Sequence, residues 1–157
     1  MVVNFNCKER STCCVSTYTV IYTAVDTQGL AATATRTVIV HPVPNTPSII
    51  GGISYTPSTP FVGADIYLTA SVYDPDSSDT LTYEWTVVSN PSGAYVQLSP
   101  AGPVTMTGQS GAAQAVVVSD TPGDHIFKLT VDDGTDTTAA YITILIDGGA
   151  QCPEREV

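Results

Sequence analysis

The amino-acid sequence predicts an all-β protein folded as a sandwich of two packed sheets. Short stretches with a two-residue apolar period recur along the chain, and turn-forming residues separate them. The clearest pair lies in residues 65–87, where one alternation covers 66–72 and a second ends near Trp85. No stretch shows a convincing helical period. Because Trp85 is the only tryptophan, we expect it to fill the middle of a core between two sheets.

The composition supports a folded β protein and excludes several functional classes. Hydrophobic residues make up 43% of the chain and charged residues only 13%, against roughly 25% in average soluble proteins. The formal net charge of −10 repels nucleic-acid phosphates and anionic lipids, and divalent cations are its natural counterions. No run approaches the roughly 20 apolar residues of a membrane helix, and residues 1–16 show no apolar signal-peptide core. We therefore expect neither nucleic-acid binding nor direct membrane insertion.

The N-terminal part predicts a hairpin without a sheet. Residues 1–16 are irregular, and residues 17–40 alternate on both sides of a turn at 26–29. An isolated hairpin is at best marginally stable, so this one needs a sheet to join. The positions that we expect to serve in such assembly are Tyr18, Val20, Tyr22, Val38 and Val40.

A stiff linker predicts the start of a second domain. Three prolines between 42 and 47 favour an extended connection, so we expect a domain over 48–147 and a C-terminal tail over 148–157. The expected strands of this domain, about seven in number, are drawn from 49–55, 66–72, 81–87, 94–98, 104–107, 112–118, 125–131 and 139–146. The residues expected to face its core include Leu68, Tyr83, Trp85, Val87, Phe127, Leu129 and Ile144.

An internal repeat links the two parts of the chain. Tyr18-x-Val20-x-Tyr22-x-Ala24-x-Asp26 matches His125-x-Phe127-x-Leu129-x-Val131-x-Asp133, and a glycine-bearing turn and a Thr/Ala-rich strand follow each. The offset of 107 residues, from Tyr18 to His125, is about one sandwich domain. We infer that residues 17–40 are the last two strands of a preceding domain of the same kind, which makes residues 1–41 a partial domain.

Two motifs in residues 48–146 resemble the PKD family of immunoglobulin-like domains. The first is Asp74-Pro-Asp followed by Leu81-Thr-Tyr83-Glu-Trp85, and the second runs from Gly123 to Gly134. His125 stands where the family usually has a tyrosine. The hairpin at 17–40 resembles the end of a bacterial surface Ig-like repeat. The resemblance implies a PKD-type, Ig-like sandwich in a secreted or cell-surface multidomain protein, where such modules are spacers, adhesion units or accessories to hydrolases.

Four cysteines lie near the ends of the chain. We expect disulfides that join Cys7 to Cys13 or Cys14, and the remaining one of that pair to Cys152. Reduced thiols are the alternative. A zinc site fits less well because no histidine is near the cluster.

Two acidic loops are candidate calcium ligands. Alternating carboxylates in a turn can supply several of the oxygens that calcium needs, and two loops at the same end of a sandwich can share a site. The alternative is that aspartate serves turn formation only. The candidate residues are Asp74, Asp76 and Asp79 in one loop and Asp132, Asp133 and Asp136 in the other.

Other chemistry finds little support. His41 and His125 are the only histidines, no nucleophile elbow is present, and a structural role fits His125 better. Glu84 is the only acid that we expect inside a strand, on a solvated face. Exposed tyrosines could bind sugar rings, although scattered surface tyrosines are commoner; the candidates are Tyr55, Tyr67, Tyr73 and Tyr141.

These observations favour a non-catalytic extracellular module that acts as a spacer or adhesion unit. The alternative is a subunit of an extracellular filament, in which the N-terminal hairpin adds strands to a neighbouring subunit. In both cases the expected partners are protein, as neighbouring domains or identical subunits.

Overall fold

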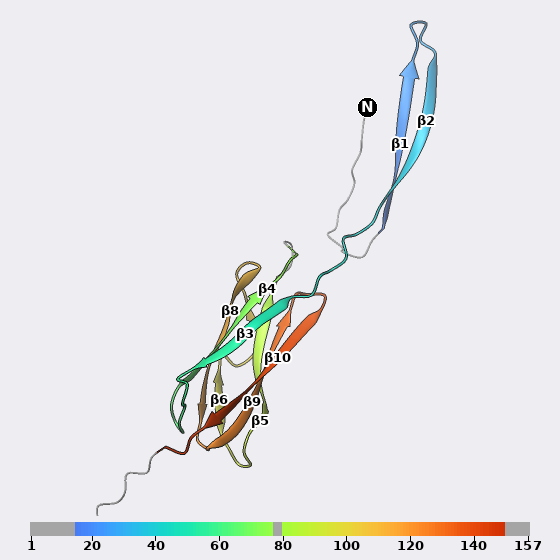
Figure 1. Ribbon diagram of the computed structural model, residues 1–157. Coiled ribbons are helices and arrows are strands. Elements are labelled where there is room, and N and C mark those ends of the chain that lie inside the picture. Colours follow the sequence, from blue (N-terminus) through green and yellow to red (C-terminus); the bar gives the residue numbers. More distant parts are fainter. Residues whose placement is uncertain (1–14, 77–79, 150–157) are drawn as a thin grey trace, which may run out of the picture. The chain divides into compact units, whose positions relative to one another are not determined.

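The structure, a computed structural model, describes residues 15–76 and 80–149 (Figure 1). This part of the chain is built from β-strands, and it contains no helix that is long and apolar enough to cross a membrane. The strands are β1 (Ser16–Val25), β2 (Ala31–Val40), β3 (Ile49–Thr56), β4 (Ile66–Tyr73), β5 (Thr82–Ser89), β6 (Val96–Ser99), β7 (Val104–Thr105), β8 (Ser110–Ser119), β9 (Gly123–Asp132) and β10 (Thr137–Ile146).

The chain forms two compact units that meet between Asn45 and Thr46, inside the predicted linker. In the first unit β1 and β2 pair antiparallel along their full length and form a two-stranded sheet. The second unit holds β3 to β10. The assignment of residues 1–41 to a partial domain stays a prediction.

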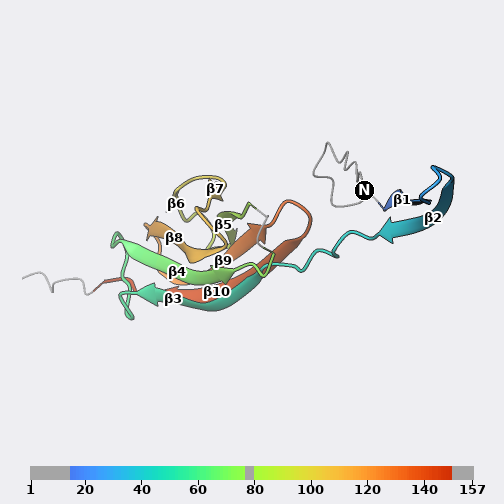
Figure 2. The ribbon, with the colours of Figure 1, turned by 90° about the horizontal axis from the view of Figure 1, so that it is seen from above.

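The second unit is a sandwich of two four-stranded antiparallel sheets. One sheet has the order β3-β4-β8-β6, and the other has the order β10-β9-β5-β7. The orders β3-β4-β8 and β10-β9-β5 correspond to strands A-B-E and G-F-C of an immunoglobulin-like sandwich, and β6 and β7 add one edge strand to each sheet. The first and last strands, β3 and β10, lie side by side across the two sheets (Figures 1 and 2). The topology confirms the predicted fold class, with eight strands because the two-residue β7 adds an edge.

Alternating apolar residues of the two sheets make one core. The predicted core residues Leu68, Tyr83, Trp85, Phe127, Leu129 and Ile144 are all buried there. Leu81 is also fully buried, although it precedes β5. The indole Nε1 of Trp85 is buried and meets no hydrogen-bond acceptor among the described residues. Trp85 therefore stabilises the core through the burial of its apolar ring surface and not through a hydrogen bond.

Three local predictions were wrong. Val87, expected in the core, is 37% exposed, although it lies opposite the buried Phe127; it is the last β5 residue before the pairing with β9 shifts register, between Val87 and Ser89. The strand expected at 94–98 starts at Val96, since the turn that precedes it extends to Ala94, whose amide bonds the carbonyl of Pro91. The strand expected at 104–107 ends at Thr105, and the next amide, of Met106, bonds the carbonyl of Leu81 instead.

Candidate functional site

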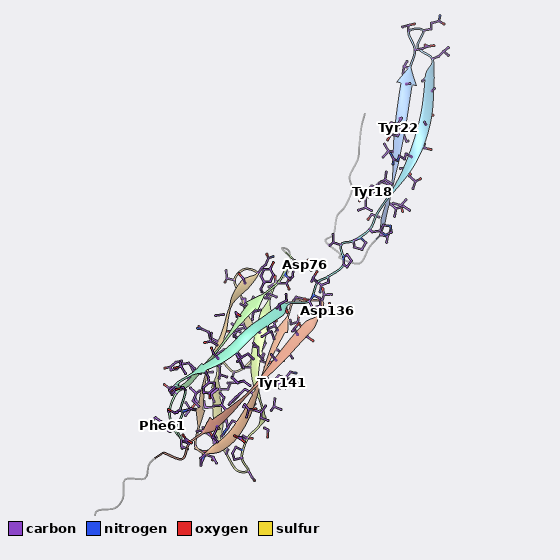
Figure 3. The ribbon with its side chains drawn as sticks, in the orientation of Figure 1. Tyr18, Tyr22, Phe61, Asp76, Asp136 and Tyr141 are labelled. Atoms are coloured by element: carbon purple, nitrogen blue, oxygen red, sulfur yellow. The ribbon has the colours of Figure 1, made fainter. Side chains whose placement is uncertain are left out.

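The two acidic loops lie at the same end of the sandwich, as Asp76 and Asp136 show in Figure 3. Their carboxylates are used as acceptors for backbone amides. Asp74 is 1% exposed, and its Oδ1 accepts a hydrogen bond of 2.7 Å from the amide of Asp76. The Oδ2 of Asp76 accepts one of 2.6 Å from the amide of Thr46. This loop therefore fastens the start of the sandwich to the turn between β4 and β5.

The loop between β9 and β10 is organised in the same way. The Oδ1 of Asp133 accepts the amides of Thr135 and Asp136 at 2.8 and 2.7 Å, and the Oδ1 of Asp132 accepts the amide of Gly134 at 2.7 Å. Gly134 has a φ of 92°, a conformation that glycine adopts without strain. Aspartate thus closes both loops by turn chemistry.

The described residues contain no group of three or more acids, histidines or cysteines that could hold a metal ion. Four of the described candidates, Asp74, Asp76, Asp132 and Asp133, each accept at least one backbone amide with a carboxylate oxygen, whereas Asp136 takes part through its own amide. Asp79, the sixth candidate, lies outside the described residues. Calcium binding in these loops stays a prediction.

His125 and Ser119 form a pair that resembles a catalytic dyad only in distance. Ser119 Oγ lies 2.8 Å from His125 Nε2, and His125 Nδ1 lies 3.0 Å from the carbonyl oxygen of Gly123. Because a carbonyl oxygen only accepts, Nδ1 donates to it. The imidazole also stacks on Phe127, with ring centroids 6.4 Å apart. Both side chains are at most 1% exposed, so no substrate reaches them and the pair ties the β8–β9 turn to the core.

Glu84 was expected to be the only acid inside a strand, and this was wrong, because β9 extends further than predicted and includes Asp124 and Asp132. Glu84 is half-buried on β5, opposite Thr130 of β9. A glycosidase needs two carboxyl groups that flank one bond. Of the described residues, Glu84 belongs to no group of three or more acids, histidines or cysteines that could hold a metal ion.

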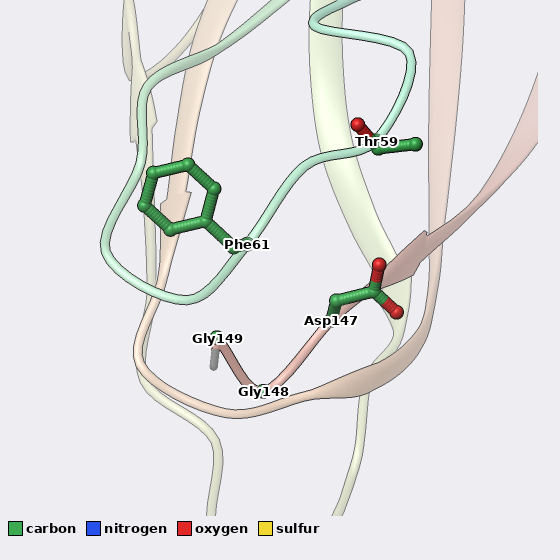
Figure 4. A pocket seen from close by; sticks show the side chains of 5 residues that line it. All are labelled: Thr59, Phe61, Asp147, Gly148 and Gly149. Carbon is green, nitrogen blue, oxygen red and sulfur yellow. The ribbon is translucent and has the colours of Figure 1, made fainter. Parts of the chain in front are cut away.

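An open pocket lies at the other end of the sandwich, where Phe61 and Asp147 form a parallel bridge (Figure 4). Its lining is Thr59, Phe61, Asp147, Gly148 and Gly149. Phe61 is 53% exposed, and Figure 4 shows its ring pointing away from the carboxylate of Asp147. The sequence analysis missed this pocket because it brings together two segments more than 80 residues apart.

The candidate tyrosines for sugar binding do not share one face. Tyr67 and Tyr73 are exposed on β4, and Tyr141 is exposed on β10 of the other sheet. Tyr55, on the edge strand β3, packs against the core instead. A platform needs neighbouring rings, and only Tyr67 and Tyr73 lie on the same face of one strand.

The β1–β2 hairpin exposes apolar side chains on both of its faces. Tyr18 and Tyr22 lie on β1 (Figure 3). Tyr22 and Val40 are about half exposed, while Tyr18, Val20 and Val38 are half-buried. The opposite face was not predicted to take part, yet Ile21 and Val25 are more than 60% exposed and Ile39 is 55% exposed. Its signal in the sequence was that apolar residues occur on both alternations of β1, where a solvated face would be polar.

The hairpin resembles the β9–β10 hairpin. Both pairs consist of ten-residue strands. In the first turn the amide of Asp26 bonds the carbonyl of Leu30, and Asp26 Oδ1 accepts the amides of Gln28 and Leu30, each at 2.9 Å. Asp133 closes the second turn in a similar way, with the carbonyl of Asp136 and the amides of Thr135 and Asp136, but this turn is one residue shorter. The sequence repeat is therefore also a repeat of the strand pair and of the aspartate that closes its turn.

All four cysteines, Cys7, Cys13, Cys14 and Cys152, lie outside the described residues, so the disulfide pairing stays a prediction.

Comparison with known proteins finds no matching family model and no matching curated protein. Among solved structures, the D00-D0 domain of intimin aligns with a TM-score of 0.47 and 19% identity, over 83% of this chain and 64% of that one. This chain thus spans less than two thirds of the intimin fragment. A conjugative transposon lipoprotein from Bacteroides eggerthii aligns with a TM-score of 0.43 and 9% identity, over 62% of this chain and 93% of that one.

Domains 4 and 5 of the S-layer protein SbsC align with a TM-score of 0.38 and 16% identity, over 75% of this chain and 65% of that one. At these levels of similarity the fold rests on the strand order of the sandwich itself.

Proposed function

We propose that this chain is a non-catalytic structural module of an extracellular or cell-surface protein, in which the PKD-type sandwich is a spacer or adhesion unit. The proposal rests on one observation: the polar side chains that could perform chemistry are buried in the sandwich and hydrogen-bonded within it. The buried ones, among them Asp74, Ser119, His125 and Asp133, are closed off from solvent and tie turns to the core. The exposed part of the chain offers strand edges and apolar side chains, which suit assembly and not chemistry.

The same proposal gives the domains their roles. Residues 1–41 are the end of a preceding Ig-like domain, 42–47 are a stiff linker, 48–147 are the spacer, and 148–157 are a tail. Calcium, if the loop aspartates bind it, stiffens the end of the sandwich next to the linker by neutralising clustered charge. The partners are neighbouring protein domains or identical subunits.

A spacer has to stay folded under tension, which single-molecule pulling on the two ends of the chain measures. We expect one cooperative unfolding event from residues 46–149, with a gain in contour length on the order of 300 Å. Gradual extension without such an event would contradict a spacer role. The matched variant Phe127→Ala, which leaves a cavity in the core, should lower the unfolding force, and Tyr141→Ala on the exposed face of β10 should not.

A second candidate function is favoured by one observation, the two-stranded sheet of β1 and β2. As a filament subunit, the chain would offer this hairpin to the sheet of a neighbour, and head-to-tail contacts of that kind give open polymers. Light scattering of the full chain over a range of concentrations, with and without reductant, tests it. Steady growth of the particle mass would support a filament, and shortening by reductant would assign a locking role to the terminal cysteines.

A further inference from the structure

The outer edge of β1 has unpaired backbone groups that can be identified one by one. The amide of Asp26 bonds the carbonyl of Leu30, so these two residues form a hydrogen-bonded pair of the hairpin. Bonded and non-bonded pairs alternate in an antiparallel ladder. The even-numbered residues of β1 therefore bond β2, and the N–H and C=O groups that point away from β2 belong to Thr17, Thr19, Ile21, Thr23 and Val25.

The β9–β10 hairpin shows what such an edge takes. In β9 the equivalent groups belong to the even-numbered residues, and β5 pairs antiparallel along this edge, with Glu84 opposite Thr130 and Thr86 opposite Lys128. Trp85 then lies opposite Leu129 on the core side. By the repeat, Thr23 and Ile21 of β1 hold the positions of Thr130 and Lys128. Of the described residues, only β2 pairs with β1, so the place that β5 takes on β9 has no occupant there.

The hairpin is the electrically neutral part of a strongly acidic chain. Between residues 15 and 40 the charged residues are Asp26 and Arg36, whereas the whole chain has a net charge of −10. Lys128 is the single basic residue between 46 and 149. The acidic sandwiches of two copies of the chain repel each other electrostatically. The hairpins have no net charge, so two copies can associate through them without this repulsion. The charge distribution thus favours a second copy as the partner at this edge.

The sequence of β1 is also complementary to itself. When two β1 strands run antiparallel with Val20 opposite Val20, Tyr18 lies opposite Tyr22 and Thr17 opposite Thr23. Pairs of two aromatic, two β-branched or two threonine residues are those that stabilise an antiparallel sheet. In this register the bonded pairs are Thr19 with Ile21 and Thr17 with Thr23, which are the residues whose backbone groups face outward.

We propose that two copies of this chain associate through their β1 edges, with Val20 at the two-fold axis, into one four-stranded sheet of the order β2-β1-β1-β2. A two-stranded sheet is marginal in water, and four strands with matched side chains are not. The interface is the same patch on both copies, so it closes at the dimer and does not propagate. This inference is independent of the spacer function. It differs from the filament hypothesis because assembly stops at two copies instead of continuing into an open polymer.

The test is the solution mass of the full chain under reducing conditions, measured by light scattering from low to high concentration. We expect the mass to rise from 16.4 kDa to twice that value and to stay there. Ile21→Pro removes one outward amide of β1 and no bond of the hairpin, so it should keep the chain monomeric. The matched control is Thr35→Pro, because Thr35 is the partner of Ile21 in the hairpin and its amide faces the outer edge of β2; this variant should still dimerise.

A second variant works even if proline unfolds the hairpin. With the native cysteines replaced by serine, Val20→Cys places two thiols opposite each other at the two-fold axis and should cross-link to a dimer on oxidation, whereas Thr35→Cys should not. A chain that is monomeric at every concentration would overturn the pairing and leave the spacer function standing. Loss of the dimer in Thr35→Pro but not in Ile21→Pro would assign assembly to β2 instead, and growth beyond the dimer would replace the pairing with a filament.

Discussion

The hairpins β1–β2 and β9–β10 have the same local structure and opposite surroundings. Each has ten-residue strands and an aspartate that closes the turn through its backbone and its Oδ1. In β9 the side chains of the repeat are fully buried, for example Phe127 and Leu129. In β1 the equivalent residues, Val20 and Tyr22, are half-buried and exposed. Local sequence therefore determines the hairpin, and neighbouring strands determine whether it gains a core.

The comparison of the two hairpins separates two contributions to stability, local hydrogen bonding and apolar burial, which usually act together in one hairpin. Turn closure and strand pairing act in both hairpins, whereas burial of apolar area acts strongly only in the second. The free energy of burial is the larger of the two, since a fully buried large apolar side chain contributes about 1.5–3 kcal/mol. Substitutions at equivalent positions should therefore differ most where a side chain fills the core and least where it only closes a turn.

The largest contrast is expected at Phe127 and Val20, which are equivalent in the repeat. Phe127→Ala should lower the free energy of unfolding of the sandwich by about 3–5 kcal/mol, because it leaves a cavity in a closed core. Val20→Ala should leave that free energy unchanged. Urea denaturation followed by fluorescence measures both, since the only tryptophan, Trp85, reports on the sandwich alone. If Val20→Ala moved the transition as far as Phe127→Ala, the hairpin would share the core and the comparison would fail.

A smaller contrast is expected at the aspartates that close the two turns. Asp133 is 3% exposed, so Asp133→Ala removes a buried carboxylate that two backbone amides share, those of the exposed Thr135 and Asp136, and should cost about 1.5–3 kcal/mol. Asp26 is exposed, and after Asp26→Ala water replaces its oxygen. The second variant should leave the denaturation of the sandwich unchanged and speed hydrogen exchange at Leu30. Equal effects on the two turns would mean that burial does not matter to turn closure.

The next contrast concerns His125, the position that corresponds to Tyr18. His125→Phe keeps the stacking on Phe127 but removes the 2.8 Å contact with the buried Ser119 hydroxyl, which keeps its bonds to the carbonyl and amide of Thr121, so we expect a cost of about 1 kcal/mol. Once His125 is replaced, Ser119→Ala should add only the loss of the bonds to Thr121. A double-mutant cycle gives the coupling energy, and additive effects would show that the 2.8 Å contact contributes nothing.

Much of the sandwich could be predicted because its signals are local. The alternation over 66–72 and 125–131 identifies which residues of β4 and β9 are buried, since successive side chains of a strand face opposite ways. Aspartates next to proline or glycine identify the turns. The sequence analysis failed at Val87, which follows the alternation of Trp85 and lies opposite the buried Phe127 but is 37% exposed, at the point where the regular pairing of β5 with β9 ends.

The candidate sites were harder to predict because they depend on contacts between distant segments. Asp74 and Asp133 each accept an amide of their own turn with Oδ1, a role that composition does not reveal, and their calcium binding stays a prediction. The bridge between Phe61 and Asp147 has no local signal at all. The exposed Ile21 and Val25 were visible in the sequence, but their meaning depends on the strand that is absent beside β1 among the described residues.

The smallest effect is expected at Asp120, an exposed residue in the turn between β8 and β9. Its side-chain contacts test whether the ordered structure of this turn extends to the protein surface. A hydrogen bond from the Thr121 hydroxyl, and a second one from the amide of Tyr95, hold the pKa of this exposed carboxyl below its usual value. A lowered pKa in the folded state means that the stabilisation is present at neutral pH, above the unfolded pKa of about 3.9, and is lost as the pH falls through the folded pKa.

An NMR titration of the Asp120 side chain measures this pKa directly. Thr121→Val removes the larger of the two contributions and should raise the pKa toward its usual value, with little change in stability at pH 7, because solvent screens an exposed carboxylate. An unchanged Asp120 pKa in Thr121→Val would show that the Thr121 hydroxyl does not hold this carboxylate in solution, and that the ordered side-chain contacts of the β8–β9 turn end at Ser119 and His125, inside the core.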